Sequence, residues 1–358
     1  MNKIKKLTGE DLRHYEKGCK GYYVLTVILE SINNLDEIID RIEKTMPCIK
    51  RKSENTIIEL ENKENMLIPN IKTSKDALNN IKKTEYMYLY SYNIEKKEIY
   101  LLYNHAVVDG LASLIFFKSI LDKETITSFY AMERLEITKT QMFLYSLKKN
   151  PLNLLKSFNK YKNEKKKILD LKSEPTLIEL IIDINIIKEI KKKYNISFNN
   201  AYCFYILQIL NQQMRCVILT NTKYKESRNY NNYGIIPFKY EKGNTPEIIE
   251  SEIKKNMIYS IISPILFALK SYLNKIYKNV DIVFSSIPIS KYNLDVKLCG
   301  NLVKDLSLYM PHHSVPIYIF STKFGDKFKI SISTKDSKVE EKFINYFEKN
   351  NLSYNILY

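Results

Sequence analysis

The stretch from Ile99 to Phe117, I-Y-L-L-Y-N-H-A-V-V-D-G-L-A-S-L-I-F-F, joins three kinds of sequence. Ile99 to Tyr103 is apolar and rich in aromatic and branched residues, which is typical of a strand buried on both faces. Asp109 stands before a second apolar run, and an Asp there favours a helix start because its carboxylate accepts hydrogen bonds from free backbone amides. The pattern therefore predicts that His105 lies where a buried strand ends and a helix is about to begin.

His105 is the candidate catalytic residue of this stretch. A histidine at a rigid strand end can take a proton from a hydroxyl, amine or thiol, since an ordinary imidazole titrates near neutral pH. The alternative is a packed or surface histidine followed by a common Asp-Gly turn. The chain has only four histidines. A His-x-x-x-Asp-Gly pattern in this strand-to-helix context therefore favours the catalytic interpretation.

The segment from His105 to Gly110 resembles the HxxxDG motif of the chloramphenicol acetyltransferase-like superfamily. That group includes peptide-synthetase condensation domains, wax-ester and alcohol acyltransferases, and plant HxxxD acyltransferases. The resemblance implies an α/β fold of two chloramphenicol acetyltransferase-like domains, each a mixed β-sheet flanked by helices, with an active-site channel at their interface. We expect the domains to span residues 1–165, which carry the motif, and 166–358.

The same resemblance implies an acyltransferase with His105 as general base and no covalent enzyme intermediate. The donor would be a thioester, either acyl-coenzyme A (acyl-CoA) or an acidic carrier protein bearing phosphopantetheine, and the acceptor a small molecule with a hydroxyl or amine. No cofactor would be bound permanently. Asp109 would form a structural ion pair that supports the loop, and Gly110 would keep the channel open beside the base.

The partner of Asp109 is expected in the segment from Met46 to Lys52. It resembles a condensation-domain segment in which an Arg pairs with the Asp of the motif. The simplest alignment puts Lys50 at that position. Arg51 comes one residue later, and a one-residue shift turns a strand side chain to the other face. Plain surface charge is the alternative for Lys50.

The segment from Asp281 to Pro288 resembles the part of the superfamily that contributes to the channel opposite the base. Ser285 or Ser286 could donate a hydroxyl to the oxyanion that forms at the thioester carbonyl. Turn capping is the alternative for both serines. Ser286 stands where the superfamily usually has Asn.

Other departures from the superfamily leave a second function open. Condensation domains have two consecutive histidines in the motif, and Asn104 replaces the first of them. The plant DFGWG motif is absent, and the chain has no Trp. A catalytically silent condensation-like protein that binds a carrier protein or an acyl ligand is therefore the alternative. A basic interaction protein with an accidental motif is the third possibility.

The composition of the chain indicates which classes of partner the protein could bind. The 358 residues carry a formal net charge of +16, which fits compositional bias from AT-rich coding or attraction to coenzyme A phosphates or an acidic carrier protein. The lysines are spread along the chain and no nucleic-acid motif occurs, so we expect no nucleic-acid partner. The sequence has no run of 18 apolar residues, so no membrane span is predicted. We expect a cytoplasmic monomer.

The five cysteines are scattered and form no CxxC pair. This pattern favours buried thiols in a reducing compartment and predicts neither a disulfide framework nor a metal site. A covalent Ser or Cys mechanism is the alternative chemistry, but no GxSxG motif occurs.

Hydrophobic periodicity predicts the order of the remaining elements. We expect strands at 22–29, 176–183, 215–220, 281–288, 303–309, 317–322 and 328–333, and hairpins pairing 57–60 with 66–68 and 87–92 with 99–103. We expect helices at 34–45, 111–121, 132–147, 185–194, 198–214, 245–262 and 339–347, with an inter-domain connection at 150–173. Ser197 is the expected N-cap of the 198–214 helix.

Overall fold

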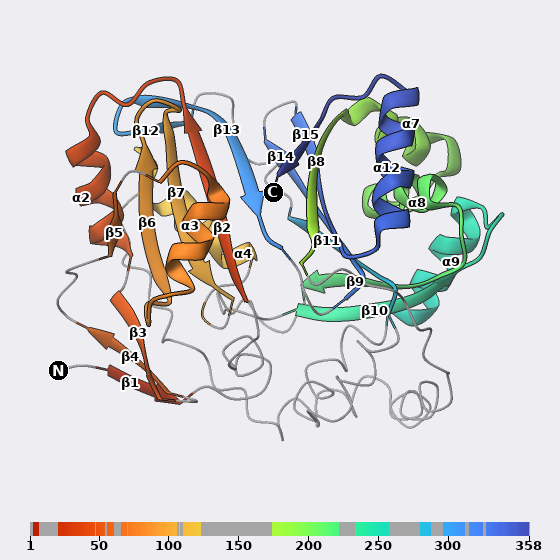
Figure 1. Cartoon of the computed structure of the whole chain (residues 1–358). Coiled ribbons are helices and arrows are strands. Elements are labelled where there is room, and N and C mark those ends of the chain that lie inside the picture. Colours follow the sequence, from red (N-terminus) through yellow and green to blue (C-terminus); the bar gives the residue numbers. More distant parts are fainter. Residues whose placement is uncertain are drawn as a thin grey trace. The chain divides into compact units, whose positions relative to one another are not determined.

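The apolar run before His105 is a strand, β7 (Glu98–Asn104), and it lies inside a six-stranded sheet (Figure 1). The computed structural model falls into two compact units. The first contains residues 1–135, 228–231 and 289–311, and the second contains residues 136–227, 232–288 and 312–358. Within them the structure describes residues 3–6, 21–46, 48–53, 56–60, 66–69, 71–105, 107, 110–122, 174–221, 233–257, 280–287, 296–311, 315–324 and 327–357.

The sheet of the first unit has the order β12-β13-β2-β7-β6-β5. Only β5 and β6 pair in parallel, so the sheet is mixed. The five residues of the predicted apolar run, Ile99 to Tyr103, are all buried in β7, and so is most of β2. Such burial is expected for strands covered on both faces. The strands besides β7 are β2 (Tyr22–Leu29), β5 (Leu67–Ile68), β6 (Tyr88–Asn93), β12 (Lys297–Leu298) and β13 (Asn301–Tyr309).

Of the two predicted hairpins, the second is confirmed and the first is wrong. β6 and β7 pair antiparallel around a turn in which Lys97 takes the left-handed conformation, φ 58°. β4 (Thr56–Leu60) instead lies between β1 (Lys3–Lys6) and β3 (Cys48–Ser53) in a separate three-stranded sheet, while β5 joins β6. Short apolar segments can extend any available strand edge, so local pattern did not determine their partners.

Helices cover both faces of this sheet. Tyr90 of β6 donates a hydrogen bond to Glu43 of α2 (Leu35–Thr45), and Thr26 of β2 hydrogen-bonds Ser74 of α3 (Ser74–Ile81). Tyr90 and Thr26 pair with neighbouring residues of β7. Neighbouring residues of a strand point to opposite faces, so α2 and α3 lie on opposite sides of the sheet.

Strands β12 and β13 come from the second half of the sequence but belong to the first sheet. β13 pairs antiparallel with β2, from Val303 opposite Leu29 to Tyr309 opposite Val24. The predicted division at residues 165 and 166 assigned this segment to the second domain, and the structure corrects it. The pairing satisfies the edge of β2, which would otherwise expose a row of free amides and carbonyls. The point of division itself lies outside the described residues.

The second unit is built on a seven-stranded sheet of order β10-β9-β11-β14-β15-β8-β16. β11 is parallel to both of its neighbours and the other pairs are antiparallel, so this sheet is also mixed. The strands are β8 (Thr176–Asp183), β9 (Met214–Asn221), β10 (Tyr233–Tyr240), β11 (Ile282–Ile287), β14 (Ile317–Phe324), β15 (Lys327–Thr334) and β16 (Tyr354–Leu357).

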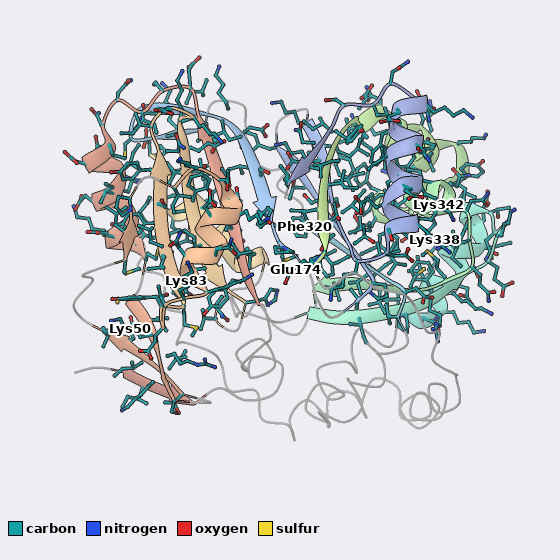
Figure 2. All side chains as sticks on the ribbon, in the orientation of Figure 1. Lys50, Lys83, Glu174, Phe320, Lys338 and Lys342 are labelled. Atoms are coloured by element: carbon teal, nitrogen blue, oxygen red, sulfur yellow. The ribbon has the colours of Figure 1, made fainter. Side chains whose placement is uncertain are left out.

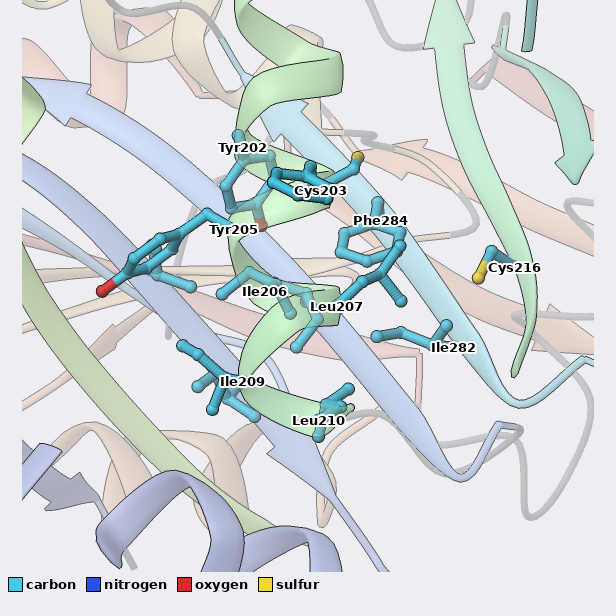
Figure 3. Packing of buried hydrophobic residues seen from close by; sticks show 14 of the residues in the cluster. Tyr202, Cys203, Tyr205, Ile206, Leu207, Ile209, Leu210, Cys216, Ile282 and Phe284 are labelled. Atoms are coloured by element: carbon cyan, nitrogen blue, oxygen red, sulfur yellow. The ribbon is translucent and has the colours of Figure 1, made fainter. Parts of the chain in front are cut away.

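One face of this sheet packs on four helices and forms the core of the second unit (Figure 3). The central one, α8 (Phe198–Leu210), is buried nearly all round, and its N-cap is Ser197, as predicted. The other three present one apolar face each, which is the usual pattern of a helix on a sheet. They are α7 (Ile184–Tyr194), α9 (Pro246–Asn256) and α12 (Ser337–Lys349).

Each unit is thus a mixed β-sheet flanked by helices, as predicted. The helix predicted at 132–147 and the connection at 150–173 lie outside the described residues. None of the helices in the described part of the chain is long and apolar enough to cross a membrane.

Candidate functional site

His105 follows β7 directly and is held by the start of β2. Its backbone amide donates a hydrogen bond to the carbonyl of Gly21, with 2.6 Å between N and O. Its imidazole meets the ring of Tyr23 edge to face, with 5.9 Å between centroids and 61° between planes. The residue is half-buried, and its Nδ1 atom is fully buried. The imidazole therefore sits at the end of the sheet with Nδ1 turned inward.

Buried aromatic rings lie beneath this imidazole. Tyr23 packs on Tyr103 at 5.3 Å between centroids, and Tyr103 makes edge-to-face contacts with Tyr88 of β6 at 5.9 Å and with Phe116 at 5.7 Å. All four rings are at most 1% exposed. We call these residues, Tyr23, Tyr88, Tyr103 and Phe116, the aromatic cluster. Edge-to-face geometry at these distances is a favourable arrangement of aromatic pairs.

Asn104 stands where the condensation-domain motif has its first histidine, and its contacts connect β7 to β2. It is buried, pairs with Tyr22 across β2 and β7, and hydrogen-bonds the Tyr22 side chain. Burial raises the pKa of the Tyr22 hydroxyl, while Asn104 and the charge of Arg51 partly counteract that rise. The charge of Arg51 therefore acts on Tyr22, whose partner Asn104 is the residue before His105.

Lys50, the predicted partner of Asp109, lies on β3 and is labelled in Figure 2. It contacts Tyr86. Its ammonium nitrogen lies 4.2 Å from the centre of the Tyr86 ring, and Lys50 and Tyr86 also form an isolated backbone bridge. A hydrogen bond with the Tyr86 side chain is the main cause of the raised pKa of Lys50. Lys50 and Arg51 lie next to each other in β3, so their side chains point to opposite faces.

The helix after the motif is α4 (Gly110–Ser119), which begins one residue earlier than predicted. Gly110 is its first residue, while Asp109 lies outside the described residues. Val107 closes a turn after β7 by donating its amide to the carbonyl of Asn104 at 3.0 Å. Phe116 and Phe117 are fully buried, which ties the helix to the sheet.

The far end of α4 is fastened by residues that the sequence did not single out. Arg41 of α2 donates to the carbonyls of Ile120 and Leu121. The carboxylate of Asp122 accepts from the backbone amides of Cys299 and Gly300, the latter at 2.8 Å. These contacts join the helix behind the motif to α2 and to the β12–β13 turn. No local pattern signals them, because the partners are distant in sequence.

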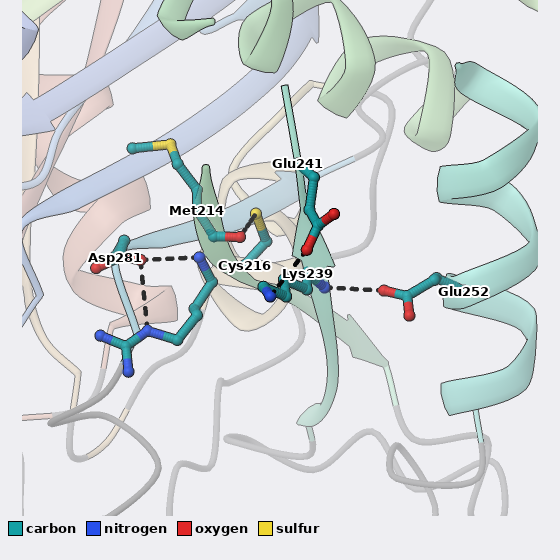
Figure 4. Close-up of polar contacts among 7 residues, drawn as sticks. Met214, Cys216, Lys239, Glu241, Glu252 and Asp281 are labelled. Carbon is teal, nitrogen blue, oxygen red and sulfur yellow. Dashed lines mark hydrogen bonds and ion pairs between the residues drawn. The ribbon is translucent and has the colours of Figure 1, made fainter. Parts of the chain in front are cut away.

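In the second unit, Ser285 and Ser286 lie on β11, whose start is fixed to β9 (Figure 4). The Asp281 carboxylate accepts from the backbone amide of Arg215 at 2.8 Å and pairs with its guanidinium at 3.5 Å. On the neighbouring β10, the amide of Lys239 donates to Glu252 of α9 at 3.0 Å. The first contacts fix the start of β11 to β9, and the last one fixes β10 to α9.

The two serines point to opposite faces of this sheet. Ile282 and Phe284 belong to the core beneath the helices, and Ser286 shares their face because side chains alternate along a strand. Ser286 lies opposite the buried Ser321 of β14, and Ser285 lies opposite Phe320. Ser285 is therefore on the face opposite to the one that packs on α7, α8, α9 and α12. His105, Gly110 and Lys50 belong to the first unit, and both serines belong to the second.

The described cysteines are buried thiols, as predicted for them. Burial is the main cause that raises the pKa of Cys203 and of Cys216, and it raises that of Cys299 to about 11. A neutral thiol is a poor nucleophile at physiological pH. Within the described residues, no group of three or more His, Cys, Asp or Glu side chains could hold a metal ion. Cys19, His14, His312 and His313 lie outside the described residues.

Comparison with family models and with curated protein sequences finds no match. Solved structures with the same fold include TRI101 from Fusarium graminearum, complexed with coenzyme A and deoxynivalenol, at a TM-score of 0.63 and 10% identity over 99% of this chain and 100% of that one. They also include the condensation domain of the Monacolin K polyketide synthase MokA, at 0.61 and 7% over 96% of each chain. A third is the wax ester synthase/diacylglycerol acyltransferase from Marinobacter aquaeolei, at 0.55 and 11% over 96% and 97%. The chain has the two-domain chloramphenicol acetyltransferase-like fold that condensation domains and coenzyme A-dependent acetyltransferases share.

Proposed function

We propose that the protein is an acyltransferase that moves an acyl group from a thioester to a hydroxyl or amine, with His105 as general base. The placement of its imidazole carries the proposal. His105 follows a buried strand and precedes α4, which begins at Gly110, and the start of β2 contacts both its backbone and its ring. Rigid support of this kind is what a base needs in order to meet its substrate in a productive geometry.

In the proposed reaction, His105 removes the proton from the acceptor as the acceptor oxygen or nitrogen attacks the thioester carbonyl. Because Nδ1 is buried, Nε2 is the nitrogen that takes this proton. The new carbon–oxygen or carbon–nitrogen bond forms, the carbon–sulfur bond breaks, and the proton passes to the departing thiolate. No enzyme nucleophile is required, which agrees with the raised pKa of the buried thiols.

We assign Ser285, and not Ser286, as the candidate donor to the oxyanion. Ser285 is on the face of the second sheet opposite to α7, α8, α9 and α12, whereas Ser286 is on the face that packs on them. For the loop that carries the motif, Lys50 stays a candidate counter-charge of Asp109, and we propose Arg51 as the preferred one, because its charge acts on Tyr22 beside Asn104 while Lys50 contacts Tyr86. Gly110 keeps its proposed role beside the base. The channel that the superfamily resemblance implies between the two domains stays a prediction.

The proposed donor is acyl-CoA or an acyl group on the phosphopantetheine of a carrier protein. The formal net charge of +16 favours an anionic partner, and both donors are anionic. TRI101, which has the same fold, is complexed with coenzyme A in its structure. The donor is a substrate, so no permanently bound cofactor is proposed. We also propose that the protein is a monomer and that it lies in the cytoplasm.

Mass spectrometry of acyl products tests the proposal. The purified protein is incubated with acetyl-, malonyl-, octanoyl- and palmitoyl-CoA or with acylated holo-carrier protein, in the presence of a panel of alcohols and amines. We expect an acylated acceptor and the free thiol in equal amounts with at least one donor. The His105→Ala variant is the control, and formation of the same product by this variant at the wild-type rate would contradict the assignment.

The alternative is a catalytically silent protein that binds an acyl ligand or a carrier protein, as the Asn104 departure suggests. Asn104 is buried and bonded to Tyr22, so this position supports the two strands. Isothermal titration calorimetry separates the two functions. Donor binding without product from any donor would favour the binding protein.

A further inference from the structure

The aromatic cluster reaches from α4 and β6 to the imidazole of His105, and one of its rings touches that imidazole. Tyr23 and Gly21 are two residues apart, and both contact His105, Tyr23 through its ring and Gly21 through its carbonyl. The backbone contact fixes where the residue stands. The ring contact limits how the imidazole can rotate about its side-chain bonds.

The Tyr23 ring can act in this way because it is itself immobilised. It is 1% exposed and packs on Tyr103, which lies between Tyr88 of β6 and Phe116 of α4. Packed interiors resist small displacements, so a ring wedged in this cluster presents a firm surface to its neighbour. Phe116 links the same cluster to the helix that follows the motif.

We propose that Tyr23 is a positioning residue that orients the His105 imidazole for proton transfer. This inference rests on the proposed function of His105 and goes beyond it, because it names the side chain on which the orientation of the base depends. Tyr23 acts through the contact of its ring with the imidazole, not through proton transfer, and it contacts no substrate in this assignment. Removing its ring should leave the base in place but free to rotate.

Three variants separate positioning from simple packing. Tyr23→Leu removes the ring that touches His105, and Tyr23→Phe retains it. Tyr100→Leu is the matched control, because Tyr100 is an equally buried tyrosine of β7 that lies on the opposite face of the sheet from Tyr103 and outside the cluster. The loss of packing is similar in the two leucine variants, but the ring beside the imidazole is lost only in one.

The first readout is the resonance of the His105 ring in full-length protein labelled with ¹³C at histidine, assigned by its disappearance in His105→Ala. Aromatic ring currents act over short distances, so we expect Tyr23→Leu to move and broaden this resonance. Tyr100→Leu and Tyr23→Phe should leave it close to its wild-type position. An unmoved resonance in folded Tyr23→Leu overturns the inference, whether or not a turned-over donor is known.

The second readout is the steady-state rate of thiol release from whichever acyl-CoA of the panel is turned over. We expect Tyr23→Leu to lower kcat by roughly 10- to 100-fold with KM changed by less than about twofold, because a misplaced catalytic group mainly slows the chemical step. Tyr23→Phe should restore most of the rate, and Tyr100→Leu should retain it.

The two proposals fail in different ways. Equal kcat in Tyr23→Leu and Tyr100→Leu, together with an inactive His105→Ala, overturns the role of Tyr23 and leaves His105 as the base. Full turnover by His105→Ala overturns the proposed function and, with it, the role of Tyr23.

Discussion

Two adjacent cations of β3 show how a single residue step decides the role of a side chain. Lys50 lies over the ring of Tyr86, while Arg51 acts on the Tyr22–Asn104 pair next to His105. The sequence placed Lys50 at the better-aligned position. Aligning the sequence with the superfamily motif could not show toward which side each face of β3 points. That depends on the pairing of β3 with β4 and with Tyr86.

Replacement of each cation in turn tests this assignment. Arg51→Ala should lower both turnover and the melting temperature, because it removes the positive charge next to the strand that bears His105. Lys50→Ala should change the free energy of unfolding by no more than about 1 kcal/mol, the usual value of a cation–π contact near the surface. Thermal unfolding and the rate of thiol release are the measurements. Equal loss of activity in the two variants would contradict the preference for Arg51.

At the scale of single elements, α8 depends on a carboxylate from α9. Glu250 accepts from the amide of Ser197 at 3.3 Å and from the Asn200 side chain, and it pairs with Lys254 at 3.0 Å. Burial alone would raise its pKa, but the hydrogen bonds from Asn200 and Lys254 outweigh burial and hold the pKa below the ordinary value of 4.5. A negative charge at this end of a helix also meets the positive end of the helix dipole.

Glu250→Gln should therefore destabilise the protein in a pH-dependent way. A carboxyl with a lowered folded-state pKa contributes stability that is present above its unfolded pKa and is lost as the pH falls through the folded value. We expect a deficit of about 1–2 kcal/mol at pH 7, shrinking below pH 4.5. Melting temperatures measured from pH 7 downward test this, with the exposed Glu241→Gln as control. A deficit that is constant with pH would contradict the role of the ionised carboxylate.

The end of α4 is a second element whose placement depends on one carboxylate. Asp122 accepts from two backbone amides at the β12–β13 turn, where Gly300 has φ 75°. Asp122→Ala should lower the free energy of unfolding by about 1–2 kcal/mol, since two amides lose a charged acceptor. Chemical denaturation measures this. Asp40→Ala, which removes an exposed ion pair with Lys44, should cost less than about 0.5 kcal/mol. Equal effects of the two variants would contradict the account.

The sequence predicted elements well wherever local pattern is sufficient. Strand β8 spans the predicted residues, and Ser197 caps α8, because alternation and capping are properties of neighbouring residues. Partners of strands are another matter. The alternation in β13 predicts a strand but carries no information on whether it extends the first sheet or the second.

The same distinction applies to the site. The position of His105 directly after a buried strand could be predicted, because the strand and the histidine are consecutive in the chain. Gly21 and Tyr23 could not, because their contacts with His105 arise only when β2 pairs with β7. The difference between Ser285 and Ser286 likewise required knowledge of which sheet face the helices cover.

At the scale of the whole molecule, the first unit is completed by a segment that follows most of the second in sequence. β13 provides one whole edge of pairing to β2, so residues 1–165 alone would leave that edge open. We expect this fragment to lack a cooperative thermal transition and to aggregate, because an open edge of a hydrophobic sheet pairs with other chains. Circular dichroism on heating and size-exclusion chromatography test this. A soluble, cooperatively unfolding fragment would contradict it.

The central claim is that His105 is the base of an acyl transfer, and one comparison tests it most directly. The rate of acyl-product formation is measured for wild type, His105→Ala and His14→Ala, each with its melting temperature. We expect His105→Ala to lose about 10²- to 10⁴-fold in rate, the usual contribution of a general base. It should keep a melting temperature close to wild type, and His14→Ala should keep its rate. A folded His105→Ala variant that forms product at the wild-type rate would contradict the claim.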